Sequence, residues 1–150
     1  MTRPKEFNQD QAIWQAIALF SQQGFTVTST DDLMHVMGIS RQSRYDTFGD
    51  KRALFLKALE LDVTESVRRI QLELEKPGPP LSAVTNALVT FAERKDMASA
   101  SGCMGLNAIS EFGEGDADVT RISRIAARSQ RDILRRVLEK AKERGELDPA

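Results

Sequence analysis

The sequence predicts an all-α protein, because apolar residues recur at helical spacing along most of the chain and no segment alternates as a β-strand does. Polar caps and glycine stops divide this pattern into separate helices. A chain of 150 residues, 41% hydrophobic and 29% charged, has the length and composition of one domain or two small ones with a buried core.

The first two helices are delimited by polar residues and glycines. Asn8 is expected to cap the first helix, and Gly24 to end it in the left-handed conformation. Thr28, followed three residues later by Asp31, predicts the cap of a second, short helix that ends at Gly38. The apolar sides of these helices carry Ile13, Ala16, Ile17 and Phe20 in the first, and Leu33, Val36 and Met37 in the second.

A third helix is predicted from Arg41 to Phe48, with Ser40 as its cap and Gly49 as its end. Asp50 then caps a long fourth helix. Apolar residues recur along the fourth helix at Phe55, Leu59, Val63, Val67, Ile70 and Leu74.

Prolines interrupt the chain after the fourth helix, in the segment KPGPP at 76–80. A fifth helix is expected around 84–91 and a short sixth helix around 103–112. Asp118 is expected to cap the last helix, from about Val119 to Arg144.

The composition argues against catalysis and metal binding. One histidine, His35, and one cysteine, Cys103, cannot supply the four ligands of a structural zinc site. The chain has no P-loop and no G-x-S-x-G motif, so we expect no enzyme activity, no metal and no cofactor. The absence of a long apolar run and of a signal-peptide pattern predicts a cytoplasmic protein.

Two short helices joined through a glycine turn, with a third helix before them, are typical of a helix-turn-helix. In that motif the second short helix enters the major groove of DNA with its N-terminal residues nearest the bases. Here those residues are Arg41, Gln42 and Ser43, which suit guanine, adenine, and either a base or a phosphate. The segment 39–57 carries five basic and two acidic residues, although residues 1–60 are balanced, so a dimer with two such patches is expected.

From about Phe7 to Leu61 the sequence resembles the DNA-binding domain of the TetR/AcrR family of transcriptional regulators. The matching motifs are AIALF, a GF turn, T-S-x-D-D-L, M-G-I-S, and Y-x-x-F-G-D-K-x-A-L-F, in order and without a gap. The resemblance implies a helix-turn-helix domain at 1–50, a connecting helix at 51–76, and a helical C-terminal regulatory domain at 77–150. It also implies phosphate contacts at Thr28 and Ser29, base or phosphate contacts at Arg41, Gln42 and Ser43, and backbone contacts at Tyr45 and Lys51.

Arg44 departs from the family pattern, which places an apolar residue there, commonly leucine. A guanidinium at this position must snorkel to water, find an acidic partner, contact DNA, or loosen the packing of the domain. The sequence leaves these roles open.

The C-terminal half is expected to bind an unidentified small-molecule effector. Residues proposed for its pocket are Phe91, Met97, Met104, Leu106, Phe112 and Ile125. Members of the family generally continue for two further helices that build the dimer, so the regulatory domain is expected to be short, with an uncertain dimer interface.

The last helix carries nine basic and three acidic residues between 121 and 144. A stripe of five arginines comprises Arg121, Arg124, Arg128, Arg131 and Arg135. This stripe is interpreted either as a solvated face or as a surface for an anionic or other partner.

Together these features predict an effector-responsive repressor that binds a palindromic, double-stranded DNA operator as a homodimer. The alternative is a helical protein-interaction module that keeps the helix-turn-helix as a scaffold and reads no DNA.

Overall fold

The computed structural model describes residues 8–93 and 103–148. Within these ranges the chain forms seven helices and no strand, which confirms the predicted all-α class. The helices are α1 (Gln9–Val27), α2 (Thr30–Met37), α3 (Arg41–Phe48), α4 (Lys51–Leu74), α5 (Pro80–Ala92), α6 (Met104–Phe112) and α7 (Ala117–Glu143). None of them is both long and apolar enough to span a membrane.

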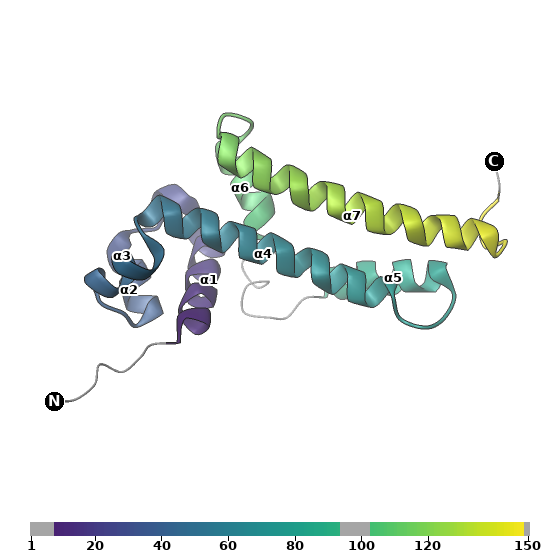
Figure 1. Cartoon of the computed structure of the whole chain (residues 1–150), viewed down its shortest axis with the longest axis horizontal. Coiled ribbons are helices and arrows are strands. Elements are labelled where there is room, and N and C mark those ends of the chain that lie inside the picture. Colours follow the sequence, from purple (N-terminus) through teal and green to yellow (C-terminus); the bar gives the residue numbers. More distant parts are fainter. Residues whose placement is uncertain (1–7, 94–102, 149–150) are drawn as a thin grey trace.

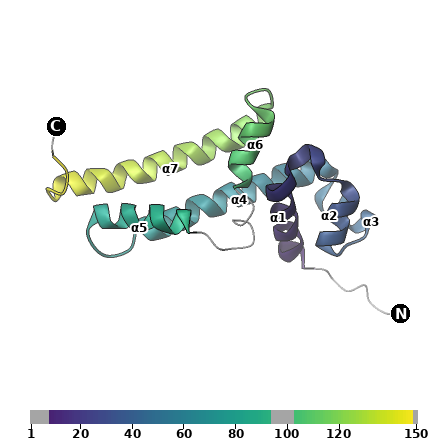
Figure 2. The ribbon, with the colours of Figure 1, turned by 180° about the vertical axis from the view of Figure 1, so that it is seen from behind.

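The three N-terminal helices gather at one end of an elongated molecule, around the start of α4 (Figure 1). The long helices α4 and α7 lie side by side and leave this end together, and α5 packs against both near their far ends (Figure 2). They run in the same direction, because Arg52 meets Asp116 near their starts and the backbone of Leu81 meets Glu146 beyond their ends. Helix α6 connects this long pair to α1.

The cap of α2 lies one residue later than the sequence predicts. Ser29, not Thr28, is the N-cap, and it exchanges hydrogen bonds with Asp32 in a complete capping box. The hydroxyl of Thr28 instead donates to the carbonyl oxygen of Gly24 at 2.6 Å. The predicted cap of α7 is also wrong: Asp116, not Asp118, accepts the backbone N–H groups of Asp118 and Val119.

Gly24 interrupts α1 as predicted, although helical structure resumes as far as Val27. Its φ of 75° and ψ of −175° belong to a region that is almost restricted to glycine. The resulting kink turns the end of α1 toward α6, where the backbone of Phe25 and Thr26 meets Glu111.

An aromatic group holds the N-terminal helices against α6. The ring of Phe55 lies 5.0 Å from Phe20, 5.0 Å from Phe25 and 5.5 Å from Phe112, between ring centroids. Such edge and tilted contacts add to the burial energy of aromatic side chains. The same core continues into α7 through Val119 and Ile122, so one apolar cluster joins the helix-turn-helix to α6 and α7.

A second, smaller apolar cluster joins the far ends of α4, α5 and α7. Its buried members are Leu74, Ala87 and Ile133. Because this cluster is separate from the first, the two ends of the long helices are held by different sets of contacts.

Candidate nucleic-acid interface

Helix α3 has one buried side and one exposed side. Arg44 and Phe48 are buried, each 6% exposed, and they anchor the helix to its neighbours. Arg41, Gln42 and Tyr45 lie on the outer side, and Tyr45 is 61% exposed. The helix therefore presents long polar side chains to solvent at one end of the molecule.

The two leading polar side chains of α3 are held by exposed acids. Arg41 pairs with Asp31 of α2 at 3.2 Å between Nη2 and Oδ1, and Gln42 donates to Asp46 at 2.7 Å. Exposed ion pairs of this kind contribute only about 0 to 1 kcal/mol. Both side chains are therefore easily released to another partner.

Two serines, Ser40 before α3 and Ser43 in its first turn, stabilise the start of this helix. Ser40 accepts the backbone N–H of Ser43 at 3.1 Å, which caps the helix, and its hydroxyl donates to the Ser43 hydroxyl at 2.9 Å. Ser43 is half-buried, so it is less accessible than Arg41 and Gln42.

The predicted phosphate contacts before α2 lie in different surroundings. Ser29 is exposed, and its hydrogen bonds to Asp32 lower the pKa of that carboxyl. Thr28 is 0% exposed, and its hydroxyl is occupied by Gly24. Only Ser29 of this pair presents its side chain to solvent.

Lys51 begins α4 and lies over an aromatic ring. Its Nζ is 4.4 Å from the centroid of Phe25, a cation–π geometry. The positive charge of Lys51 also helps to lower the pKa of the nearby Glu111 carboxyl. The lysine is half-buried beside the kinked end of α1.

Arg44 turns into the domain and does not snorkel to water. Its Nη1 donates to the carbonyl oxygen of Gly49 at 3.0 Å, whereas its buried Nε has no hydrogen-bond partner within the described part of the chain. Of the roles left open by the sequence, this geometry corresponds to the last one, a buried guanidinium that loosens the packing of the domain.

Glu111 of α6 binds the backbone at the kinked end of α1. Its carboxylate oxygens accept the N–H groups of Phe25 and Thr26, each at 2.8 Å. Burial alone would raise the pKa of this carboxyl, but the backbone hydrogen bonds outweigh it and lower the pKa. Asn107, one turn earlier, donates to the carbonyl oxygen of Ser21 at 2.8 Å, so two side chains of α6 hold α1.

Arg52 ties the start of α4 to the start of α7. Its guanidinium binds both oxygens of Asp116, at 2.7 and 3.1 Å, and reaches Asp118 at 3.1 Å. This forked pairing lowers the pKa of Asp116 to about 2 and raises the pKa of Arg52. The helix-turn-helix end of the molecule is thus attached to α6 through α1 and to α7 through α4.

The residues proposed from the sequence for an effector pocket do not come together. Met104 and Phe112 belong to the apolar core, whereas Phe91, Leu106 and Ile125 are exposed. Met97 lies outside the described residues.

A cavity of about 250 Å³ lies between α4 and α7 instead. Ile125 is the one residue from the proposed set that lines it. The other lining residues are Glu60, Val63, Thr64 and Val67 from α4, and Ile122, Ala126 and Ser129 from α7. The feature of the sequence that could have predicted this cavity is the small size of Ala126 and Ser129, because small side chains leave space where two helices approach.

Within the described ranges, no group of three or more histidine, cysteine, aspartate or glutamate side chains is arranged to hold a metal ion. Cys103 is half-buried at the start of α6 and forms no disulfide.

The chain matches one protein-family profile and is similar to several bacterial transcriptional regulators. A family profile described as "Bacterial regulatory proteins, tetR family" matches residues 13–58, from α1 into α4. The uncharacterized HTH-type transcriptional regulator YezE of Bacillus subtilis (strain 168) is 32% identical over 149 residues, covering 99% of this chain and 77% of that protein. The HTH-type transcriptional repressor ComR of Escherichia coli (strain K12) is 27% identical over 151 residues, covering 98% of this chain and 71% of that protein.

Two solved structures have the same fold. The crystal structure of reduced E. coli NemR superimposes with a TM-score of 0.77 at 20% identity, covering 90% of this chain and 71% of that one. PfmR from Thermus thermophilus, a TetR family transcriptional regulator, gives a TM-score of 0.71 at 19% identity, covering 94% of this chain and 75% of that one. The predicted all-α fold with an N-terminal helix-turn-helix is confirmed.

Proposed function

This chain belongs to the TetR family of bacterial regulatory proteins, and from that premise we propose that it is a transcriptional regulator that reads double-stranded DNA with α3. The observation that carries the proposal is the two-sided α3, whose buried side is anchored while Arg41, Gln42 and Tyr45 face solvent. A recognition helix needs both properties, because it must be held rigidly and yet enter a groove.

The side chains proposed to contact DNA divide into base-reading and phosphate-binding groups. Arg41 and Gln42 are long enough to reach base edges, where arginine pairs with guanine and glutamine with adenine. Ser29, Ser43, Tyr45 and Lys51 are assigned to the DNA backbone or adjacent positions. The side chain of Thr28 is left out of the interface, because its hydroxyl is buried against Gly24.

The mode of regulation is proposed to be repression by a homodimer. A dimer places two recognition helices about 34 to 36 Å apart, one helical repeat of DNA, and so reads a palindromic operator. The relative ComR is named a transcriptional repressor, which supports repression as the mode of regulation. The protein is proposed to act in the cytoplasm, where it meets chromosomal DNA.

A small-molecule effector is proposed to bind in the cavity between α4 and α7. Its walls are mainly apolar, with Glu60, Thr64 and Ser129 as polar groups that can orient a ligand. A ligand that separates α4 from α7 would strain the Arg52–Asp116 pair at their common end. The helix-turn-helix would then shift, so that DNA and effector favour different arrangements of the same molecule.

Selection of bound sequences from random duplex DNA tests the function. A palindrome is the expected result, because a two-fold dimer presents α3 twice. The affinity for the selected operator is expected to fall with salt, with a log–log slope of about −0.9 for each neutralised phosphate. Failure to enrich any sequence, together with a salt-independent protein partner, would favour the interaction-module alternative.

A further inference from the structure

Each of the two side chains proposed to read bases has an acidic partner. Arg41 and Gln42 are the first two residues of α3. Asp31, in the first turn of α2, accepts a hydrogen bond from Nη2 of Arg41 at 3.2 Å. Asp46, one turn along α3, accepts one from Nε2 of Gln42 at 2.7 Å. All four residues are exposed, so the two acids lie on the same accessible surface as the reading groups.

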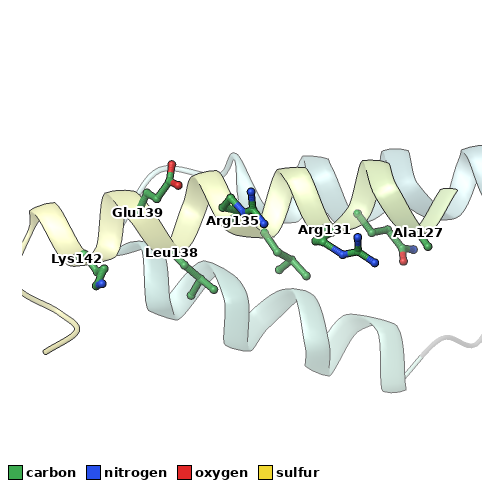
Figure 3. Close-up of a pocket in the computed structure, with 8 residues that line it drawn as sticks. Ala127, Arg131, Arg135, Leu138, Glu139 and Lys142 are labelled. Atoms are coloured by element: carbon green, nitrogen blue, oxygen red, sulfur yellow. The ribbon is translucent and has the colours of Figure 1, made fainter. Parts of the chain in front are cut away.

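Exposed arginines of this chain do not all have such a partner. Arg131 and Arg135 extend from α7 along a groove lined by that helix (Figure 3), and neither forms an ion pair in the described part of the chain. Arg41 differs because an acid of another helix lies within reach. Its pair with Asp31 connects the first turn of α2 to the first residue of α3. The place of Asp31 on α2 therefore determines where the guanidinium of Arg41 rests.

The two acids make the outer side of α3 poor in positive charge. At neutral pH Arg41 contributes +1, and Asp31 and Asp46 contribute −1 each, so the three groups together carry −1. Neutralised phosphates supply most of the affinity that is independent of sequence. The acids therefore lower the affinity for DNA of any sequence, and discrimination between sequences is the property that they can improve.

The Asp46 carboxylate determines which end of the Gln42 amide faces it. An ionised carboxylate can only accept hydrogen bonds, so it binds the NH2 group and directs the carbonyl oxygen Oε1 elsewhere. Because Nε2 keeps a second N–H, Gln42 still presents one donor and one acceptor, the pair that adenine requires at N7 and N6. The contact fixes the direction of the amide without consuming its reading groups.

Asp31 acts on Arg41 in a similar way. The guanidinium carries several N–H donors in a fixed plane, and the contact with Asp31 engages Nη2. The remaining donors are sufficient for the O6 and N7 of guanine. Because this acid lies on α2, the packing of α2 against α3 sets the direction in which Arg41 reads.

We propose that Asp31 and Asp46 are specificity-determining positioning residues, an assignment that rests on the proposed reading of DNA by α3. They hold Arg41 and Gln42 in directions that suit guanine and adenine. At a site with these bases, both side chains pair while they keep their acidic partners. At another site, a side chain must leave its acid to find a new contact, and the carboxylates repel nearby phosphates. The acids thus lower the affinity for wrong sequences more than the affinity for the operator.

A purely electrostatic role is the competing explanation. In that case the carboxylates repel every DNA equally, and their removal raises all affinities by the same factor. Positioning instead requires that each acid act through its partner. The effect of Asp46 on discrimination must then disappear when Gln42 is truncated, and that of Asp31 when Arg41 is truncated.

The test uses the full chain and two duplexes of equal length, namely the operator that the parent selects from random DNA and an unrelated sequence. Fluorescence anisotropy at one fixed salt concentration gives both dissociation constants, and their ratio is the specificity ratio. The variants are Asp31→Asn, alone and with Arg41→Ala, and Asp46→Asn, alone and with Gln42→Ala. Thermal melting followed by circular dichroism compares the folding of all variants.

Two controls remove the same charge elsewhere. Asp10→Asn changes an exposed aspartate in the first turn of α1, as Asp31→Asn does in α2. Glu139→Gln changes an exposed glutamate of α7 toward the end of the molecule opposite to α3 (Figure 1). Both controls are expected to keep the specificity ratio within about twofold of the parent.

Asp46→Asn is expected to lower the specificity ratio about two- to fivefold, because an asparagine amide both donates and accepts and no longer fixes the amide of Gln42. Asp31→Asn is expected to lower it by a similar factor through the lost ion pair with Arg41. Binding of the unrelated duplex is expected to tighten about twofold in both variants, since one negative charge is removed. With Gln42→Ala or Arg41→Ala already present, the same substitutions are expected to leave the ratio unchanged.

Two results would overturn the proposal. They are an unchanged ratio in both single variants, and an equal fall of the ratio with and without the partner side chain. Either would limit the acids to a general electrostatic effect. If the parent enriches no sequence, the reading of DNA by α3 fails and the assignment fails with it. If the parent enriches a palindrome and the ratios do not change, the assignment alone fails.

Discussion

The guanidinium of Arg44 donates from Nη1 to the carbonyl oxygen of Gly49 at 3.0 Å, inside the helix-turn-helix domain. One hydrogen bond does not compensate a buried positive charge, and the Nε of Arg44 lacks a hydrogen-bond partner in the described structure. The side chain nevertheless fills a position between α3 and the other helices, with 6% of its surface exposed. The domain therefore contains an incompletely compensated buried charge on α3.

Replacing this residue in Arg44→Leu is expected to stabilise the protein. A leucine keeps an apolar volume at the site and removes the uncompensated charge, so the expected gain is about 1 to 3 kcal/mol. For a chain of this size, that corresponds to a rise in Tm of roughly 2 to 10 °C. Thermal unfolding followed by circular dichroism measures it. The matched control is Arg41→Leu on the exposed side of α3, expected to change stability by less than about 0.5 kcal/mol. An unchanged or lower Tm in Arg44→Leu would mean that the buried guanidinium is not a source of strain.

The helix boundaries illustrate what local sequence signals predict well. Ser40, Asp50 and Gly49 were identified correctly because each is the one suitable cap or stop at its boundary. Before α2 the choice was ambiguous, since Thr28 and Ser29 each precede an aspartate by three residues. The side chain of Thr28 binds the carbonyl oxygen of Gly24, which leaves Ser29 to cap the helix.

Only part of the candidate site could be predicted from local sequence signals. The outward side of α3 could be predicted, because Arg44 and Phe48 lie one turn apart on the buried side, and Gln42 and Asp46 lie one turn apart on the side away from them. The cavity between α4 and α7 could not be predicted, because it depends on how these two helices approach each other. Met104 and Phe112 have the composition of pocket residues but pack into the core, whereas Ala126 and Ser129 leave space through their small size.

Tyr45→Ala is expected to weaken operator binding about three- to tenfold, because one contact to the DNA backbone is lost. Helicity and Tm are expected to remain close to the parent, since the ring is largely exposed. Fluorescence anisotropy with the selected operator measures the affinity. Tyr45→Phe separates the hydroxyl from the ring, and Asn86→Ala on α5 serves as a control far from the interface. If Tyr45→Ala bound operator like the parent, Tyr45 would have to be removed from the proposed interface.

Lys51→Ala is expected to change how DNA binding depends on salt concentration more than it changes which DNA sequence the protein prefers. If Lys51 neutralises one phosphate, the slope of log affinity against log salt becomes shallower by about 0.9 in the variant. Titrations at several salt concentrations, on the operator and on unrelated DNA, give the two slopes. Lys76→Ala, just beyond the opposite end of α4, is the control with an unchanged slope. An unaltered slope in Lys51→Ala would limit this lysine to its contact with Phe25.

The Arg52–Asp116 pair predicts a specific loss of stability in acid. Because the pKa of Asp116 is lowered from 3.8 to about 2, this carboxylate stabilises the folded protein above about pH 4. That contribution is lost as the pH falls through the interval from 3.8 to about 2. Asp116→Asn keeps a good helix cap but removes the charge, so its Tm is expected to lie below that of the parent at neutral pH.

The difference in Tm between the parent and Asp116→Asn is then expected to shrink as the pH falls below about 4. Thermal melts from neutral pH down to strong acid provide the comparison. Arg52→Gln is the matched partner variant, since it should reduce the pH dependence that Asp116 contributes to the part that comes from the backbone N–H groups of Asp118 and Val119. A constant difference between the two proteins across this range would show that the pair does not contribute in this way.

Gly24, at the kink of α1, lies next to the Glu111 carboxylate that attaches α6 to α1. Substitutions at these two residues can therefore separate the loss of this attachment from backbone strain. A Cβ at Gly24 would lie 2.6 Å from Oε2 of Glu111, and the backbone there has a φ of 75°. Gly24→Ala is therefore expected to cost about 1 to 3 kcal/mol from the backbone conformation alone. The methyl group must also displace the carboxylate, which would break its hydrogen bonds to Phe25 and Thr26. Glu111→Ala removes the same bonds directly, at an expected cost of about 1 kcal/mol.

A double-mutant cycle distinguishes these two contributions. If the methyl group of Gly24→Ala expels the carboxylate, Gly24→Ala/Glu111→Ala is expected to be more stable than the sum of the single variants implies, by about 1 kcal/mol. Urea unfolding of the four proteins gives the coupling energy directly. Strict additivity would instead mean that Glu111 moves aside and keeps its hold on the backbone. Because Glu111 connects α6 to α1, which shares one apolar core with Phe48 of α3, the same four proteins can be compared for operator affinity. A loss of affinity in Glu111→Ala, without a change at α3 itself, would then measure how strongly α6 influences the DNA-binding end.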